Sequence, residues 1–253
     1  MIGIYFSGTG NTKYCVERFV HYFDSATMAV SIEQDNIDAL LADHGTVVFG
    51  YPVYYSNIPK IVRDFITDHK NSFAGKKIFI IATMGLFSGD GAGCSARLLK
   101  KYGASVTGGL HITMPDCIGD VKLLKKSLEK NRALVRAAEK KIDASAERMK
   151  QGRPDRNGLN IFSHAAGLFC QRLWFYGETN SYKSKPKIDR DNCIVCGICV
   201  KNCPMKNLKQ IEGSIISGKK CTLCYRCVST CPAKALTIIG KKVYEQCLLD
   251  KYA

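Results

Sequence analysis

The sequence predicts an α/β protein with a doubly wound parallel sheet, followed by a small α+β module built around cysteines. Over the first 150 residues, short apolar runs alternate with stretches of helical periodicity. Further along the chain, two cysteine arrays share the same spacing. A segment rich in Gly, Pro and Arg separates the two parts, and 253 residues are enough for two modest domains.

Five apolar runs are short, partly β-branched and bounded by Gly, Asp or Pro, which is typical of buried strands. They span residues 1–6, 26–32, 46–50, 77–83 and 105–113. Helical periodicity fills residues 11–23, 58–68 and 91–102. In a sheet of this kind ligands bind beyond the carboxyl ends of the strands, so the loops that follow the runs are the candidate site.

The loop after the first strand reads Ser-Gly-Thr-Gly-Asn-Thr from Ser7 to Thr12. Its hydroxyls, its close-approaching glycine backbone and the N-terminus of the following helix predict an anion cradle. It lacks the Gly-Lys-Ser/Thr of a Walker loop and the third glycine of a dinucleotide fingerprint. No Lys or Arg lies within it, so neutral donors would hold the anion. Without those glycines, Glu33 is expected to be a surface residue and not a ribose ligand.

This loop resembles the [ST]-x-T-G-x-T phosphate loop of flavodoxins, which bind FMN. Residues 51–59 and 83–91 resemble the two flavodoxin loops that pack on either side of the isoalloxazine ring. Tyr54, Tyr55 and Phe87 offer faces for stacking, with ordinary packing as the alternative for each. The resemblance covers residues 1–150. The FMN contacts that it implies are Ser7, Thr9, Gly10, Asn11, Thr12, Pro52, Val53, Tyr54, Tyr55, Asn57, Thr83, Met84, Gly85, Phe87, Gly89, Asp90 and Gly91.

The chain departs from the flavodoxin pattern in charge and in cysteines. Flavodoxins tend to be acidic carriers, whereas this chain is basic, so its docking surface is expected to differ. Cys94 and Cys117 fall near the predicted site. A nucleophile near the flavin is one interpretation of Cys94, and a buried helix cysteine is the favoured one.

Residues 122–156 carry a long basic helical pattern that predicts the last helix of the first domain, with a possible extension as a strut. Residues 152–158 break it and mark a domain boundary. Residues 159–177 are unusually apolar for a linker and are interrupted by His164, Gln171 and Arg172. They predict a helix docked between the domains, which contains Cys170 and Trp174; a membrane-surface helix is the alternative.

Residues 193–204 and 221–232 each read C-x2-C-x2-C-x3-C-P. This run resembles that of bacterial-type ferredoxins, which hold two 4Fe-4S clusters and whose fourth cysteine ligates the other cluster. A module this small needs such a metal staple to fold. Zinc knuckles and a disulfide framework are the alternatives; the spacing disfavours the first, and the absence of a secretion signal disfavours the second. The resemblance implies one cluster on Cys193, Cys196, Cys199 and Cys231, and a second on Cys221, Cys224, Cys227 and Cys203.

The net charge is +15, and from Lys183 onward 14 Lys and Arg face 5 Asp and Glu. No nucleic-acid motif accompanies this excess, so an acidic protein partner is the better prediction. Thirteen cysteines without a signal peptide indicate a reducing compartment, the cytoplasm. No apolar run is long enough to span a membrane. The histidines are not spaced as metal ligands, so none is assigned to a metal. Cys247 is given no role beyond packing. The sequence does not indicate the oligomeric state.

The whole chain resembles the flavodoxin-ferredoxin fusion proteins of anaerobic bacteria and archaea. We expect an FMN domain at 1–150, a linker with an apolar helix at 151–186 and a two-cluster domain with a tail at 187–253. The resemblance implies an electron-transfer oxidoreductase that relays low-potential electrons between the clusters and FMN and exchanges them with redox proteins. One alternative is an FMN-dependent reductase of a quinone, flavin or nitro compound, which an open pocket beside Tyr55 and Phe87 would support. The other alternative is a redox-sensing binding module. The sequence has no second nucleotide-binding motif, so direct oxidation of NAD(P)H is disfavoured.

Overall fold

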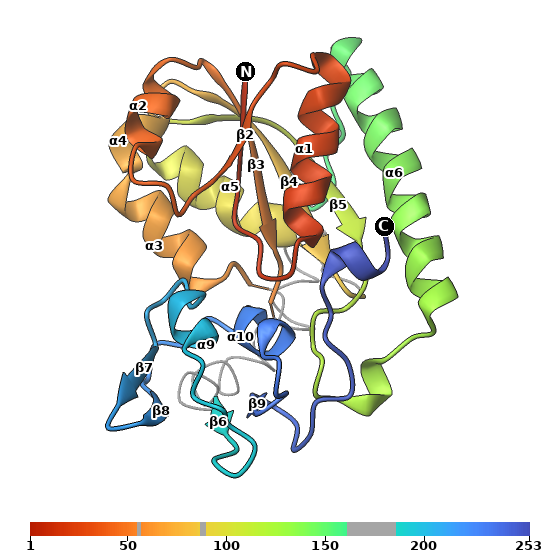
Figure 1. The fold of residues 1–253 in the computed structure, drawn as a ribbon. Coiled ribbons are helices and arrows are strands. Elements are labelled where there is room, and N and C mark those ends of the chain that lie inside the picture. The colour runs from red at the N-terminus through yellow and green to blue at the C-terminus, as the bar shows by residue number, and fades with distance from the viewer. Residues whose placement is uncertain (55–56, 87–89, 161–185) are drawn as a thin grey trace.

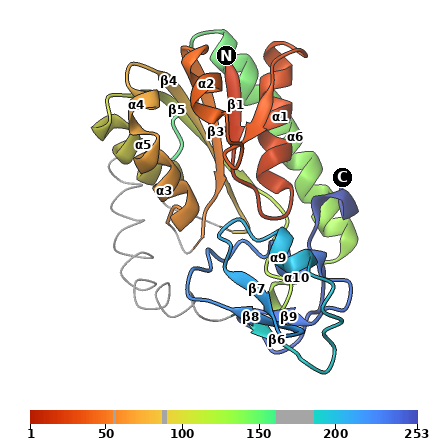
Figure 2. The same ribbon diagram turned by 60° about the vertical axis from the view of Figure 1, so that its left-hand side comes forward.

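The structure is a computed structural model that describes residues 1–54, 57–86, 90–160 and 186–253. A parallel sheet flanked by helices occupies one end of the molecule (Figure 1). A smaller part, residues 186–253, lies against the edge of the sheet where the strands end; we call it the cysteine module. Figure 2 shows the same division from a second direction.

The sheet contains β1 (Ile2–Tyr5), β2 (Ala29–Ser31), β3 (Thr46–Pro52), β4 (Lys77–Met84) and β5 (Ser105–Thr113). Their order is β2-β1-β3-β4-β5, and each neighbouring pair is parallel. This confirms the predicted doubly wound sheet. The strand order reverses between β1 and β3, and the crevice beyond the carboxyl ends at such a switch point is where open α/β sheets bind ligands.

Helices cover both faces of the sheet. Buried residues of α1 (Asn11–Phe23) and α6 (Leu128–Lys150) form one apolar core with the sheet. Those of α2 (Ile37–Ala42), α3 (Lys60–Asp68), α4 (Lys70–Phe73) and α5 (Gly91–Lys101) form the other. α1 has the bounds that the sequence predicted. α2 and α4 were not anticipated, because helices of four to six residues are too short to show a periodicity.

The long helix is shorter than the predicted 122–156. It begins after Ser127, whose hydroxyl accepts a hydrogen bond from the Lys130 amide, and only a 3-10 turn (Lys122–Leu124) precedes it. It ends at Lys150, and Gly152 follows with a φ of 74°. Residues 155–157 then run beside β5, where the Gly109 amide donates to the Asp155 carbonyl at 2.8 Å. The first part of the predicted linker therefore packs on the sheet.

The cysteine module consists of two short antiparallel ladders and two short helices. β6 (Lys187–Ile188) pairs with β9 (Leu236–Thr237), and β7 (Leu208–Ile211) pairs with β8 (Ser214–Ser217). α9 (Ile198–Lys201) and α10 (Arg226–Thr230) each contain the third cysteine of their array, Cys199 and Cys227. The predicted duplication extends to the backbone, because positive φ angles recur at equivalent positions. These pairs are Val195 and Leu223, Gly197 and Tyr225, and Lys206 and Lys234.

Two contacts fix the cysteine module to the sheet domain. The buried Asp120 carboxylate, in the loop between β5 and α6, accepts hydrogen bonds from Tyr225 Oη at 3.0 Å and from the amides of Ile238 and Ile239 at 2.6 and 3.0 Å. After β9, the tail returns to the sheet domain, where the Leu249 amide donates to the Thr9 carbonyl at 2.9 Å. Tyr252, which is 2% exposed, enters the core beneath α1 and α6. These are two of the places at which the module is attached to the sheet domain.

The predicted apolar helix at 159–177 falls almost entirely outside the described residues, together with Cys170 and Trp174. Among the helices that the structure describes, none is long and apolar enough to cross a membrane.

Candidate functional site

A cavity opens at the switch point, beyond the ends of β1, β3 and β4. Its first wall is the predicted anion cradle, of which Ser7, Thr9, Asn11 and Thr12 line the cavity. Gly10, with a φ of 101°, turns the chain into α1, and its amide donates to Ser7 Oγ at 3.1 Å. We call this space the switch-point cavity.

The loops after β3 and β4 form the opposite wall, which Pro52, Val53, Tyr54, Thr83, Met84 and Gly85 line. Thr83 reaches the cradle itself, because its Oγ1 lies 2.7 Å from Thr12 Oγ1 in a buried hydrogen bond. Tyr54 is held by a tight turn in which its amide and carbonyl both pair with Asn57. Three loops that the sequence placed at strand ends therefore meet around one cavity.

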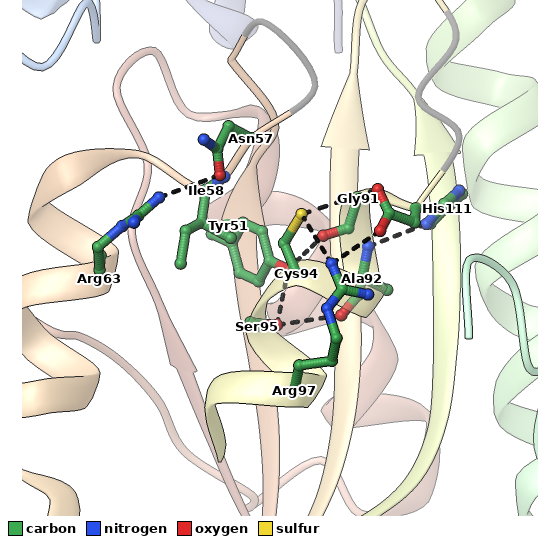
Figure 3. Close-up of polar contacts among 11 residues, drawn as sticks. Tyr51, Asn57, Ile58, Arg63, Gly91, Ala92, Cys94, Ser95, Arg97 and His111 are labelled. Atoms are coloured by element: carbon green, nitrogen blue, oxygen red, sulfur yellow. Dashed lines mark hydrogen bonds and ion pairs between the residues drawn. The ribbon is translucent and has the colours of Figure 1, made fainter. Parts of the chain in front are cut away.

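Four other predicted contacts do not line it. Gly10 shapes the cradle, and the Asn57 carboxamide is occupied with the Ile58 amide and Arg63 (Figure 3). Asp90 is fully buried at the start of α5 and ion-pairs with Arg97 at 2.8 Å, while the Gly91 carbonyl accepts from Tyr51 Oη. The remaining three predicted contacts, Tyr55, Phe87 and Gly89, lie outside the described residues.

Cys94 lies on the first turn of α5, half-buried, and is not among the residues that line the switch-point cavity. Its Sγ is 3.8 Å from Asp90 Oδ1 and 3.7 Å from an Arg97 nitrogen (Figure 3). Nearby, His111 Nε2 accepts a hydrogen bond from the Ala92 amide at 3.1 Å. Burial lowers the pKa of His111 to about 4, so the ring is neutral at pH 7 and caps the helix as an acceptor.

Sequence reasoning missed part of the cavity wall. The loop after β5 contributes Asp116 and Cys117, and the cysteine module contributes Leu223 and Tyr225. Burial raises the pKa of both Asp116 and Cys117 above their ordinary values. The loop after β5 could have been found, because it follows a strand of the same sheet. The module residues could not, since only the docking of the two parts brings them here.

The switch-point cavity fits a flavin mononucleotide by its donor set. The amides of the first turn of α1 lack partners within the helix and point toward the cradle, which suits a phosphate. Asn11 donates to the Pro115 carbonyl at 2.7 Å, yet its Oδ1 is buried with no partner among the described residues. A sugar hydroxyl would satisfy that acceptor. The wall at Val53, Tyr54 and Met84 is apolar or aromatic, as a flavin ring requires.

The eight array cysteines separate into two sets, each lining its own cavity. Cys203, Cys221, Cys224 and Cys227 line one, which we call the inner site. Cys193, Cys196, Cys199 and Cys231 line the other, the outer site. These are the two sets that the ferredoxin resemblance implied, each taking its fourth cysteine from the opposite array. All eight are free thiols in the structure.

Among the described residues, no three His, Cys, Asp or Glu side chains converge on a single metal ion. Burial raises the pKa of Cys227 well above its usual value, and the neighbouring thiols of the inner site act in the same direction. Four thiols crowded in this way suit a cationic metal group that stabilises their thiolate forms.

Arg226, directly after Tyr225, joins the inner site to the cradle. Its guanidinium makes a bidentate ion pair with Glu33 at 2.7 and 2.9 Å and donates to the Ser7 carbonyl at 2.8 Å. Glu33 is exposed, as predicted for a surface residue, and it also contacts Arg226 of the cysteine module. No sequence pattern could link two residues so far apart in the chain.

The sheet with its switch-point cavity and the paired cysteine sites define a two-domain redox protein. The flavodoxin domain family matches residues 2–114, and the 4Fe-4S dicluster domain family matches residues 185–232. The chain therefore has a flavodoxin domain followed by a 4Fe-4S dicluster domain, the arrangement of a flavodoxin-ferredoxin fusion protein. No curated protein matches the chain.

Several solved flavodoxin structures are similar to the first part of the chain. A flavodoxin from the domain Archaea is 16% identical over 59% of this chain and 97% of its own, with a TM-score of 0.42. Two-electron reduced Megasphaera elsdenii flavodoxin is 26% identical over 55% of this chain and 99% of its own, with a TM-score of 0.41. Flavodoxin 2 from Bacillus cereus is 18% identical over 60% of this chain and 97% of its own, with a TM-score of 0.44.

Proposed function

We propose that this protein, whose domains establish an electron-transfer redox role, relays electrons between two 4Fe-4S clusters and one FMN. The observation that carries the proposal is the composition of the switch-point cavity. Its walls come from the three flavodoxin loops and also from Leu223 and Tyr225, which flank the inner-site ligand Cys224. A cluster on the inner site and a flavin in the cavity would share this wall. The fold thus supports electron exchange within one chain.

The cradle from Ser7 to Thr12 would hold the FMN phosphate, and Asn11 would bind the sugar chain. Pro52, Val53, Tyr54 and Met84, with Gly85 at the loop backbone, would surround the ring. FMN accepts one or two electrons whereas each cluster passes one, so their combination converts between the two stoichiometries. The protein supplies position, and it excludes water at the buried Thr12 and Thr83 hydroxyls.

The partners in this proposal are redox proteins with acidic surfaces in a reducing, cytoplasmic compartment. The excess of Lys and Arg after Lys183, 14 against 5 acidic residues, supports that charge preference. The proposed units are an FMN domain at 1–150, a linker at 151–186 and the two-cluster domain at 187–253. The reductase alternative depends on open space beside Tyr55 and Phe87, which lie outside the described residues.

The first test is anaerobic purification with iron, sulfide and flavin quantified, followed by stepwise reduction. We expect about eight irons and one FMN per chain, with electrons equilibrating between flavin and clusters as their absorbances change. Clusters that reduce without any exchange with the flavin would contradict the relay. Turnover of a quinone or nitro compound at rates that a protein partner does not exceed would favour the reductase.

A matched pair of variants tests the flavin site. Thr12→Val removes the buried hydrogen bond to Thr83 in the cradle and should weaken FMN binding by about 1 kcal/mol, roughly fivefold. Thr107→Val removes a similar hydroxyl bond, from Thr107 Oγ1 to the Ile78 carbonyl, on the edge strand away from the cavity. Equal FMN affinities in the two variants, measured by flavin fluorescence, would count against the cradle.

A further inference from the structure

The two cysteine sites have the same ligand spacing but different neighbours. At the inner site, Cys224 and Cys227 are buried, and Cys224 belongs to the apolar core of the sheet domain. At the outer site, Cys196 is exposed and the adjacent Ile194 is 66% exposed. None of the residues that line the outer-site cavity also lines the switch-point cavity.

Tyr225 is common to the inner site and the flavin cavity. Its side chain lines both cavities, is 1% exposed and donates to Asp120 at 3.0 Å. Its backbone is left-handed, with a φ of 56°, where the first array has Gly197 with a φ of 74°. A bulky residue in that conformation is strained and persists only where the surroundings hold it. Here the buried ring and the bond to Asp120 hold it between the two cavities.

The backbone on either side of Tyr225 is equally close to the cradle. A Cβ at Gly8 would lie only 2.1 Å from the Cys224 carbonyl oxygen, so the cradle and the inner-site loop are in direct contact. On the other side, Arg226 binds the Ser7 carbonyl. Tyr54, in the loop after β3, packs against the apolar core that includes the inner-site Cys224.

From these contacts we infer that the relay is ordered, which rests on the proposed function. A cluster on the inner-site cysteines would exchange electrons directly with a flavin in the switch-point cavity, and a cluster on the outer-site cysteines would face the redox partner. Tyr225 is the positioning residue that holds the junction between inner cluster and flavin. Each step moves one electron from a reduced centre to an oxidised one and breaks no bond to the protein. The partner supplies or removes that electron at the outer site.

Equivalent positions in the two arrays provide a matched test. Leu223 and Val195 both precede a cysteine, both have positive φ, and asparagine tolerates that conformation. Leu223→Asn should alter the signal of the inner cluster, the flavin reduction potential and FMN affinity. Val195→Asn should alter the outer cluster alone. Electron paramagnetic resonance of the half-reduced holoprotein then shows which of the two cluster signals interacts magnetically with the flavin.

The order is supported if the interacting cluster is the one that Leu223→Asn perturbs. It is overturned if the flavin interacts with the cluster that Val195→Asn perturbs, or equally with both. If Leu223→Asn does not fold, Val195→Asn alone decides. The order is then supported if the cluster that interacts with the flavin is the one that Val195→Asn leaves unchanged, and it is overturned if Val195→Asn perturbs that cluster. Iron, sulfide and flavin are quantified in the same samples, so a loss of either cofactor in the wild type reports failure of the relay itself and not of its order.

Tyr225→Phe and Tyr225→Gly test the positioning role. The first keeps the ring and removes the bond to Asp120; the second installs the residue of the other array and relieves the backbone strain. We expect both to be stable enough to bind iron, and the glycine variant to weaken the magnetic interaction with flavin while phenylalanine retains most of it. An unchanged interaction in Tyr225→Gly would remove Tyr225 from the junction.

Discussion

The sheet domain and the cysteine module are stabilised by different means. The sheet buries apolar side chains on both faces, with whole strands such as β4 below 10% exposure over seven of their eight residues. The module has two-residue and four-residue strands and helices of four and five residues, and three of its cluster cysteines are part of its small core. Elements that short do not hold together by packing alone. The sheet domain has two large apolar cores, whereas the module is expected to depend on metal and on its neighbour.

Removing iron is expected to give the largest difference in stability between the two domains. Because folding of the module is coupled to its metal ligands, chelation under anaerobic conditions is expected to unfold residues 186–253 while the sheet persists. Hydrogen exchange would then show lost protection in the module and retained protection in β3 and β4. Equal protection with and without iron would mean that packing suffices.

Cys196→Ala and Cys224→Ala are each expected to lose one cluster and destabilise the whole module, since the two arrays exchange their fourth ligand.

Variants of Asp120 test how much the stability of the module depends on its contact with the sheet domain. The buried Asp120 carboxylate accepts three hydrogen bonds from the module, so Asp120→Ala removes their acceptor and should cost about 1 to 3 kcal/mol of module stability for each buried donor left without a partner. Asp120→Asn, which keeps one acceptor oxygen, should cost less. Hydrogen exchange of the Ile238 and Ile239 amides measures the loss of stability in both variants. If Ala and Asn behave alike, the carboxylate does not carry the docking.

Acid should act on the sheet domain through His111. The pKa of this buried ring is about 4 in the folded protein against 6.5 for a free histidine. Between those values the unfolded chain binds the extra proton, so the contribution is complete above pH 6.5 and is lost as the pH falls toward 4. At pH 5 the loss is about 2 kcal/mol. Urea unfolding of the sheet at pH 7 and pH 5 should show it in the wild type and not in His111→Gln.

The ion pair between Arg226 and Glu33 is expected to give the smallest effect, because both side chains are partly exposed. Arg226→Gln should release FMN about fivefold faster, in line with about 1 kcal/mol for such a pair, because the Ser7 carbonyl also loses a donor. Arg18→Gln is the control, since Arg18 makes a similar bidentate pair with Asp143 within the sheet domain. Similar release rates in the two variants would show that Arg226 does not act on the cradle.

Much of the sheet domain is predictable because its signals are local. Strand runs and the bounds of α1 follow from periodicity, and the cradle follows from six consecutive residues. The start of α6 was misplaced by six residues because the basic pattern continues through the 3-10 turn, and only the Ser127 cap marks the true beginning. Such caps compete with periodicity and are easily overlooked in a charged stretch.

The junction between the domains could not be predicted, because its contacts are non-local. The arrays that begin at Cys193 and Cys221 have the same cysteine spacing, and the residues that differ between them do not by themselves say which site lies nearer the cradle. That difference arises only when Tyr225 meets Asp120 and Arg226 meets Glu33. Glu33 was predicted only as a surface residue, and no sequence pattern singles out Asp120.

The returning tail has a consequence for how the protein matures. The Leu249 amide holds the Thr9 carbonyl of the cradle, and Leu223 and Tyr225 close its cavity. The flavin compartment is therefore finished only after the segments on both sides of the last cysteine have been synthesised and docked. If the module folds around its clusters as proposed, iron-sulfur assembly would precede secure flavin retention. Cells short of iron would accumulate a chain that has its sheet but releases its flavin.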